Sequence, residues 1–354
     1  MRTNRLVPDV QKIAVLRANA IGDFIFTLPA LHALRQAYPK AEIVLLGREW
    51  HQKFLANRPG PVDRVVAIPY EAMDGEAKIV DPAIMQPITE RLAGEKFDLA
   101  LQLHGGGGNS NLIINRLEAR LTAGMRTPEA PPLDRWIPYV YFQSEYLRYL
   151  EVVALVGATT SELEPHLAVT TEDLNESCRV VPESKAPLVV FHPGASVPNR
   201  RWPAARFAAV ADALAEAGCQ VVISGAGNEN LLSEEIIATM RQPALDVCGK
   251  LSLGGLAGLL SRSALVISND SGPLHLAGAV GAATVGLYWA INVITAAPPY
   301  RERHRPLISW QTRCPTCGTD CIHSKCGHDS SLIEEIEVAE VLTAAHELLS
   351  QYSK

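Results

Sequence analysis

Short apolar runs alternate along the chain with segments of helical spacing, and this alternation constrains the fold more than any other feature. The run Ile13 to Leu16 contains no polar residue, and a turn with Gly22 follows it. Leu28, Leu31 and Leu34 then recur at helical spacing. A continuous apolar run is typical of a parallel strand buried on both faces. The pattern predicts the α/β class, with parallel, doubly wound sheets.

The same rhythm occurs twice, and a polar stretch separates the two halves. We predict strands at residues 13–16, 42–46, 64–68 and 97–103, and again at 188–191, 220–224, 264–268 and 283–287. A proline-rich loop over 127–138 and a helix over 140–156 complete the first half, and an amphipathic helix over 333–350 ends the second. A chain of 354 residues suits two domains. We therefore expect Rossmann-like domains at 1–180 and 181–354, with the final helix packing back on the first domain.

In open parallel sheets ligands bind beyond the carboxyl ends of the strands, so the loops after the apolar runs are the first places to look for a site. The loop after the first run contains Asn19, Gly22 and Asp23. Asp23 is either a general base that takes a proton from a hydroxyl group or an N-cap of the following helix. The loop after the fourth run begins with His104 and Gly105 and contains four consecutive glycines, which permit close approach of a ligand.

Two loops of the second half carry groups suited to an anion. His192-Pro193-Gly194-Ala195-Ser196 is followed by Arg200 and Arg201 ahead of a predicted helix. Guanidinium groups near a helix N-terminus bind phosphate through charge-assisted hydrogen bonds, although a solvated basic pair is an equally good interpretation. The segment Asp270-Ser271-Gly272 opens another helix, in which His275 is either a ligand or a packed side chain.

Charge and termini limit the classes of partner. A net charge of -6 gives no electrostatic case for binding nucleic acid, so an anionic substrate has to be met locally. Besides Arg200 and Arg201, the local candidates are Arg301, Arg303 and Arg305. The first residues lack the pattern of a secretion signal, and the longest apolar stretches fall short of the roughly 20 residues that span a bilayer. We expect a cytoplasmic enzyme, with peripheral association at the inner face of the membrane left open.

Taken together, the ordered motifs resemble those of the family 9 glycosyltransferases, which include the lipopolysaccharide heptosyltransferases. The matching segments are Leu16 to Pro29, His192 to Pro203 and Asp270 to Ala277. The resemblance implies a GT-B fold, in which two parallel sheets face each other across a cleft. It also implies an inverting, metal-independent transfer from a nucleotide sugar, often ADP-heptose, to a glycan, a lipopolysaccharide core, another lipid-linked acceptor or a protein.

The resemblance assigns roles to individual residues. The N-terminal domain would bind the acceptor, with Asp23 as general base and with Asn19, Gly22, His104 and Gly105 nearby. The C-terminal domain would bind the donor through the diphosphate-binding Arg200, the ribose-binding Glu229 and the donor-site loop. The donor-binding set is Ser196, Arg200, Arg201, Glu229, Asp270, Ser271, Gly272 and His275. After the donor loop the chain reads Tyr288-Trp289-Ala290-Ile291-Asn292, where relatives often have a Gly-Pro-Thr-like turn.

Four cysteines form a cluster near the C-terminus. Cys314, Cys317, Cys321 and Cys326 lie in one short segment that also contains His323 and His328. A Cys-x-x-Cys pair with two further thiolates can hold a tetrahedral metal ion, and disulfides are disfavoured in a reducing cytoplasm. We predict a structural zinc or iron site at the four cysteines and no cofactor for catalysis.

Two alternatives to a glycosyltransferase stay open at this point. One is a sugar-nucleotide epimerase on the same GT-B scaffold. The other is a non-catalytic protein that binds a sugar nucleotide, against which the presence of Asp23 counts.

Overall fold

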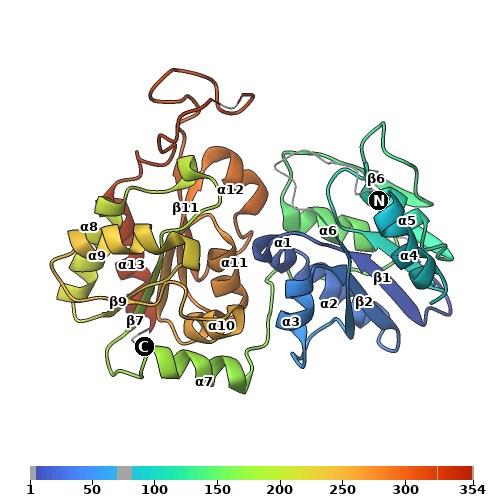
Figure 1. Ribbon diagram of the computed structural model, residues 1–354, viewed down its shortest axis with the longest axis horizontal. Helices are drawn as coiled ribbons and strands as arrows, with labels where there is room; N and C mark the ends of the chain where they lie inside the picture. The colour runs from blue at the N-terminus through green and yellow to red at the C-terminus, as the bar shows by residue number, and fades with distance from the viewer. Residues whose placement is uncertain (1–4, 70–81, 325, 353–354) are drawn as a thin grey trace. The chain divides into compact units, whose positions relative to one another are not determined.

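A computed structural model describes residues 5–69, 82–324 and 326–352 of the chain. The chain divides into two compact units, Met1–Pro165 and His166–Lys354 (Figure 1). Each unit contains one six-stranded sheet whose strands all run parallel, with helices as connections. This architecture confirms the α/β class expected from the alternating pattern.

The first unit alternates strands and helices from its start. Its strands are β1 (Lys12–Leu16), β2 (Glu42–Gly47), β3 (Arg64–Ala67), β4 (Leu99–Gln102), β5 (Leu121–Arg126) and β6 (Arg135–Pro138). Its helices are α1 (Ile21–Ile25), α2 (Leu28–Ala37), α3 (Glu49–Leu55), α4 (Pro82–Ala93), α5 (Ser110–Asn115) and α6 (Glu145–Ala154). Burial of Ile13 to Leu16 on both faces of the sheet explains why β1 has no polar residue after Lys12.

The second unit repeats this arrangement. Its strands are β7 (Leu188–His192), β8 (Gln220–Ile223), β9 (Leu245–Asp246), β10 (Leu265–Asn269), β11 (Thr284–Trp289) and β12 (His304–Ser309). Its helices are α7 (Thr171–Val180), α8 (Ala204–Glu216), α9 (Asn230–Thr239), α10 (Leu253–Ser261), α11 (Gly272–Ala279), α12 (Ala290–Ala296) and α13 (Val338–Tyr352). Two short 3₁₀ helices, η1 (Pro198–Arg200) and η2 (Gly227–Glu229), lie in its loops.

Both sheets have the same topology. The first has the order β3-β2-β1-β4-β5-β6, and the second, taken from its other end, has the order β9-β8-β7-β10-β11-β12. The chain reverses its direction of winding between β1 and β4 in one sheet and between β7 and β10 in the other. In doubly wound folds a ligand binds at this switch point, beyond the carboxyl ends of the two central strands. The four loops selected from the sequence follow these central strands, and the segment bearing Glu229 follows the neighbouring β8.

The boundary between the units lies earlier than residue 180. Helix α7, which we assigned to the first domain, packs on α10 of the second unit. Glycines of α10 make this close packing possible, because a Cβ atom on Gly258 would lie only 2.2 Å from the carbonyl oxygen of Asp173. Glu176 also accepts a hydrogen bond from the amide of Ser252 at 2.6 Å. The polar stretch that we took for a domain boundary is therefore largely the solvated face of a helix.

The final helix packs differently from our expectation. Val341, Ala345 and Leu348 of α13 are buried in the core of the second unit, beside α8 and strands β10 to β12. The apolar face of α13 is thus used within the core of its own unit, whereas we expected it to pack back on the first domain.

Two details of the first unit also differ from the sequence prediction. The proline-rich loop ends in an edge strand, β6, which pairs only with β5, and Pro138 is tolerated at its end because an edge strand leaves one row of amides unpaired. The helix that we predicted from residue 140 begins at Glu145. Main-chain carbonyls of Val140 and Tyr141 instead accept hydrogen bonds from the buried side chain of Arg148.

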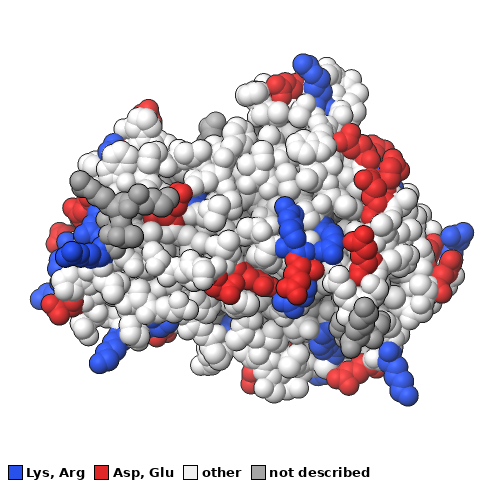
Figure 2. All heavy atoms as spheres, turned by 180° about the vertical axis from the view of Figure 1, so that it is seen from behind, with Lys and Arg blue, Asp and Glu red and all other residues white. Residues whose placement is uncertain are grey.

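The surface carries charges of both signs. On the face shown in Figure 2, acidic and basic side chains are interspersed among uncharged ones. Among the described residues, every helix is either too short or too polar to cross a membrane.

Candidate active site and cysteine cluster

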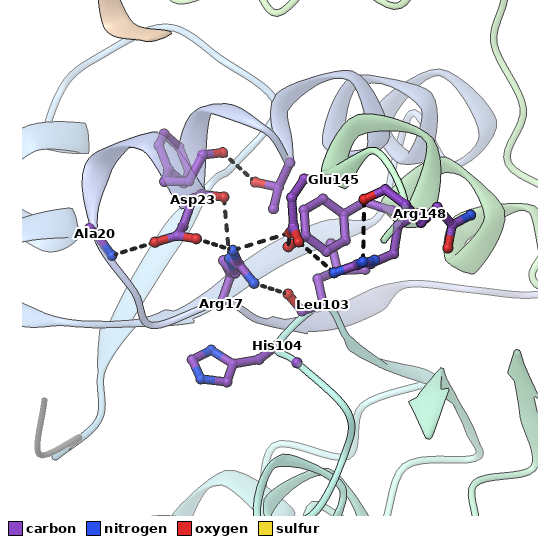
Figure 3. Close-up of polar contacts among 12 residues, drawn as sticks. Arg17, Ala20, Asp23, Leu103, His104, Glu145 and Arg148 are labelled. Atoms are coloured by element: carbon purple, nitrogen blue, oxygen red, sulfur yellow. Dashed lines mark hydrogen bonds and ion pairs between the residues drawn. The ribbon is translucent and has the colours of Figure 1, made fainter. Parts of the chain in front are cut away.

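In the first unit, the loops after β1 and β4 meet at the switch point (Figure 3). The Arg17 side chain extends from the end of β1 and donates a hydrogen bond from Nη1 to the carbonyl oxygen of Leu103 at 2.7 Å. The amide of Ala18 donates to Nδ1 of His104 at 3.3 Å. The structure therefore brings together the two loops that we chose as acceptor-side candidates.

Asp23 forms an ion pair with the buried Arg17. Its Oδ1 lies 2.7 Å from Nη2 of Arg17, whose side chain is only 3% exposed, whereas the side chain of Asp23 is 33% exposed. Its Oδ2 accepts a hydrogen bond from the amide of Ala20 at 3.2 Å, which caps the first turn of α1. Asp23 is therefore not the N-cap residue, which is Ala20, but the N3 residue whose carboxylate accepts from the N-cap amide. The same carboxylate is partly exposed.

A second layer of side chains holds Arg17 in place. Glu145 lies 3.7 Å from Nη2 of Arg17, and the guanidinium group packs over the ring of Tyr149 at 4.9 Å. Burial raises the pKa of Tyr149 well above its ordinary value, so its hydroxyl stays protonated and donates to Glu145. Arg148 pairs with the other oxygen of Glu145. This network fixes the orientation of Arg17 and thereby that of the Asp23 carboxylate (Figure 3).

His104 is present in the site as a neutral imidazole. Burial, assisted by the charge of Arg17, lowers the pKa of His104 to about 3. With this pKa the ring is not an acidic imidazolium near neutral pH, so we expect His104 to contribute hydrogen bonds rather than general acid catalysis.

The glycine-rich loop after β4 is held firmly at its base. Nε2 of Gln102 donates to the carbonyl of His104 at 2.7 Å and to Ser110 at 2.6 Å. A Cβ atom on Gly107, whose φ is +93°, would lie 2.5 Å from the side chain of Asn111, so this position requires glycine. Gly105 has a φ of +62° with open space where a side chain would be. Close packing thus explains Gly107, whereas at Gly105 the positive φ alone favours glycine.

The remaining acceptor-side candidates contribute through the main chain. Gly22 is buried inside α1 and its carbonyl accepts from the amide of Phe26 at 3.1 Å. The carbonyl of Asn19 accepts from Nε1 of Trp50 at 3.2 Å. Both shape the turn that carries Asp23.

In the second unit, Asn269 joins the loops after β7 and β10. Its fully buried side chain accepts from the amide of Trp202 at 3.1 Å and donates to the carbonyl of Pro193 at 2.6 Å. The two loops are therefore fixed relative to each other by one amide group.

Asp270 follows and is the centre of the donor-side constellation. Its Oδ1 lies 3.0 Å from Nε2 of His275, and its Oδ2 accepts from Nδ2 of Asn292 at 2.6 Å. Nη1 of Arg200 lies 3.7 Å from the same Oδ2. Because the Asp270 side chain is only 7% exposed and is fully engaged, it is suited to orienting these partners rather than to binding an anion itself.

The two neighbouring arginines behave differently. Nη2 of Arg200 donates to the exposed Ser196 hydroxyl at 3.2 Å, and its guanidinium is partly accessible. Arg201 donates from Nε and Nη2 to the carbonyl of Ala195, at 3.0 and 2.8 Å, and so secures the loop. Arg200 is therefore the better placed of the two to meet a phosphate group.

Glu229 lies against the loop after β7. Its Oε2 is 4.0 Å from Nε2 of His192 and accepts from the amide of Ala226 at 2.7 Å. A Cβ atom on Gly194 would lie 2.0 Å from Oε1 of Glu229, so a side chain at this position would displace the carboxylate. Burial lowers the pKa of His192. The structure thus joins Glu229 to the motif that contains the arginines.

Ser271 and Gly272 lie at the N-terminus of α11. Ser271 is the N-cap residue, and its hydroxyl is 3.1 Å from that of Ser268. The first amides of a helix have no partner within the helix, and the helix dipole there favours negative charge. This end of α11 is suited to an anion such as a diphosphate.

Arg301, Arg303 and Arg305 are not part of this site. They lie at the start of β12, whose first residue, His304, pairs with Thr284 at the start of β11. The amino ends of parallel strands form the opposite edge of the sheet from the switch-point loops. Arg305 instead pairs with Glu347 of α13 at 3.2 Å.

The cysteine cluster lies in the excursion between β12 and α13 (Figure 1). Ligand atoms of Cys314, Cys317, Cys326 and His328 lie within 4.8 Å of one another. Cys321 lies outside this set, and its amide donates to the carbonyl of Thr312 at 2.9 Å, so the structure brings together three of the four cysteines that we predicted as ligands, and with them His328. The turn from Cys314 to Gly318, closed by a hydrogen bond from the amide of Gly318 to the carbonyl of Cys314 at 2.8 Å, holds Cys317 beside Cys314. Cys321 lies on the antiparallel return of the chain.

The donor atoms of this group suit a metal ion. Three thiolates with one imidazole are a common tetrahedral set for zinc, and thiolates also bind iron.

Several site residues were not identified from the sequence. Arg17 is a charged residue directly after an apolar strand, which is a usable signal. Glu145, Tyr149 and Asn292 come from distant segments, and their role depends on which helices pack beside the switch points. The segment from Tyr288 to Asn292 supplies the side-chain amide that orients Asp270.

Comparison with known proteins agrees with this geometry. The family described as glycosyltransferase family 9 (heptosyltransferase) matches residues 85–326, more than half of the chain. The lipopolysaccharide core heptosyltransferase OpsX of Haemophilus influenzae is 24% identical over 300 residues, covering 81% of this chain and 82% of that protein.

Solved structures show the same fold. A family 9 glycosyl transferase from Veillonella parvula has a TM-score of 0.82 at 24% identity and covers 98% of this chain and 100% of that one. The E. coli ADP-heptose lps heptosyltransferase II has a TM-score of 0.76 at 21% identity, with coverage of 97% and 100%. The dodecameric, iron-containing heptosyltransferase TibC has a TM-score of 0.56 at 13% identity, with coverage of 98% and 78%.

The two doubly wound units have the GT-B fold of heptosyltransferases of known structure. The chain belongs to glycosyltransferase family 9, the heptosyltransferase family.

Proposed function

We propose that the protein is an inverting heptosyltransferase that transfers a heptose from ADP-heptose to a hydroxyl group of a lipopolysaccharide core or a related glycan. The observation that carries this proposal is the pair of switch-point sites, one with an accessible carboxylate held by Arg17 and one with Arg200 beside a helix N-terminus. The names of the relatives, which include a lipopolysaccharide core heptosyltransferase and an ADP-heptose enzyme, support the choice of donor and acceptor.

The first unit would supply the general base. Oδ1 or Oδ2 of Asp23 would accept the acceptor proton while the hydroxyl oxygen attacks the anomeric carbon, and the bond from that carbon to the diphosphate breaks. Attack from the face opposite to the leaving group inverts the configuration. Arg17 would hold the carboxylate in one orientation before proton transfer, and general base catalysis depends on such positioning.

The second unit would hold the donor. Negative charge grows on the diphosphate as it leaves, and Arg200 with the first amides of α11 would stabilise that charge more in the transition state than in the ground state. Glu229 would accept hydrogen bonds from the ribose hydroxyls. With the charge met by these groups, the proposed chemistry does not require a metal ion.

Donor screening tests this function directly. We expect release of ADP from ADP-heptose that depends on an acceptor from the lipopolysaccharide inner core, at a rate that does not change when Mg²⁺ or Mn²⁺ is added. Turnover with UDP- or GDP-sugars but not with ADP-heptose would contradict the choice of donor. Retention of configuration in the product would contradict the inverting mechanism.

We further propose a structural metal ion at the cysteine cluster, held by Cys314, Cys317, Cys326 and His328. The convergence of four ligand atoms in an exposed segment supports this assignment, and the description of TibC as iron-containing adds iron to zinc as a candidate. Such an ion would crosslink the segment and would take no part in transfer.

Elemental analysis of the purified protein tests the metal assignment. We expect about one zinc or iron ion per chain, lost in Cys314→Ser and retained in Cys321→Ser, because a tetrahedral structural site uses all of its protein ligands. The Cys321 variant is the matched control, since it changes a cysteine of the same segment. Equal loss of metal from both variants would contradict the ligand set.

A further inference from the structure

The segment that carries the cysteine cluster returns to the core beside the donor-site arginines. Ser331 donates from its hydroxyl to the carbonyl of Arg201 at 2.7 Å. The amide of Leu332 donates to the carbonyl of Asn199 at 2.8 Å. These two bonds hold the main chain on both sides of Arg200.

The cluster and these bonds are close in the sequence and in space. His328 precedes Ser331 by only three residues. The hydroxyl of Thr316, in the turn between the first two cysteines, lies 2.7 Å from that of Ser330. Holding the four ligands in place therefore also restrains Ser330 and Ser331, and Ser331 contacts the main chain of Arg201.

The segment has no apolar core of its own. Of the described residues between Gln311 and Ser331, Cys314 alone is buried. Among the described residues the segment is held chiefly by hydrogen bonds, which oppose its conformational entropy only weakly because they are wholly or partly exposed to water. A metal ion supplies the missing crosslink in small domains of this kind.

We propose that metal binding by Cys314, Cys317, Cys326 and His328 positions Arg200 for the nucleoside diphosphate, by fixing Ser331 and Leu332 against the carbonyls that flank it. This inference rests on the proposed function of Arg200 in donor binding and on the proposed metal site. Arg200 is the group that contacts the diphosphate, and the metal ion and its ligands act only through it. The metal site thus controls donor affinity without contacting the donor.

The test measures the affinity of the full-length protein for ADP, with and without metal. Removal of the ion by a chelator should weaken ADP binding roughly tenfold, a size typical of losing a group that orients a binding residue. Returning the metal should restore the affinity. His328→Ala should behave like the chelated protein, and Cys321→Ser like the untreated protein. Thermal unfolding and circular dichroism of each form show whether the fold is retained.

The Arg200→Ala variant distinguishes an effect of the metal on the position of Arg200 from an effect on the stability of the whole unit. In that variant, removing the metal should change ADP affinity by less than about twofold, because groups that act through one residue are not additive. An equal loss with and without Arg200, or wild-type ADP affinity that does not respond to metal, would overturn the inference.

The underlying proposals fail in recognisably different ways. A protein that binds metal but no ADP in any form would refute the proposed donor site and this inference with it. A protein that binds ADP but neither contains nor takes up metal would refute the metal site and the inference, and would leave the donor site intact.

Discussion

Asp23→Asn is expected to lower kcat for transfer by about 10²- to 10⁴-fold while leaving the Kd for ADP unchanged, which is the range that a general base contributes. Asparagine keeps one oxygen, which can accept from Arg17 or from the amide of Ala20, so one of the two hydrogen bonds of Asp23 is lost. A Tm measurement shows whether the turn and α1 are preserved. The lost property is the ability to accept a proton. Steady-state kinetics with a saturating acceptor, together with ADP titration, measure both quantities.

Glu145→Gln is the matched control for Asp23. It removes a carboxylate from the same network, but that carboxylate contacts Arg17 from the side of α6 and is only 17% exposed. We expect a clearly smaller loss of kcat than in Asp23→Asn. Wild-type turnover in the Asp23 variant would remove it as the base, and a comparable loss in both variants would point to a role in orientation alone.

Arg200→Ala is expected to weaken ADP binding by about 10- to 100-fold, since a hydrogen bond to a charged group contributes about 1.5–3 kcal/mol and each 1.4 kcal/mol is tenfold. The kcat value should fall as well, because charge on the departing diphosphate is greatest in the transition state. Asp270 keeps His275 and Asn292 as partners, so the loop should remain folded. Calorimetric titration with ADP measures the affinity, and Tm reports on folding.

Two further substitutions sharpen this result. Arg200→Lys keeps the positive charge but not the two-pronged geometry, and we expect it to recover part of the lost affinity. Arg305→Ala removes an arginine at the opposite edge of the same sheet and should leave ADP affinity unchanged. A loss in Arg305→Ala equal to that in Arg200→Ala would show that net charge, rather than the position of Arg200, governs binding.

The sequence by itself determined the fold class and the places where a site can form. Runs such as Ile13 to Leu16 and Leu188 to Phe191 have to be buried on both faces, and that requirement specifies parallel strands whose loops gather at one edge. The polar residues in the loops after such strands, among them Asp23 after β1 and Asp270 after β10, are therefore identifiable from the local pattern. The local sequence was sufficient to locate these loops because the end of each strand and the start of the next helix are close together in the chain.

Only the tertiary structure decided how these residues are held. Glu145 and Tyr149 reach Arg17 because α6 packs beside the first switch point, and Asn292 reaches Asp270 across 22 residues of sequence. Tertiary structure also decided that His328, and not Cys321, lies beside the other three cysteines, and that α7 packs on the glycines of α10. Such contacts depend on packing between segments remote in sequence, and no local pattern encodes which of several polar groups arrives within about 3 to 4 Å of a given carboxylate or thiol.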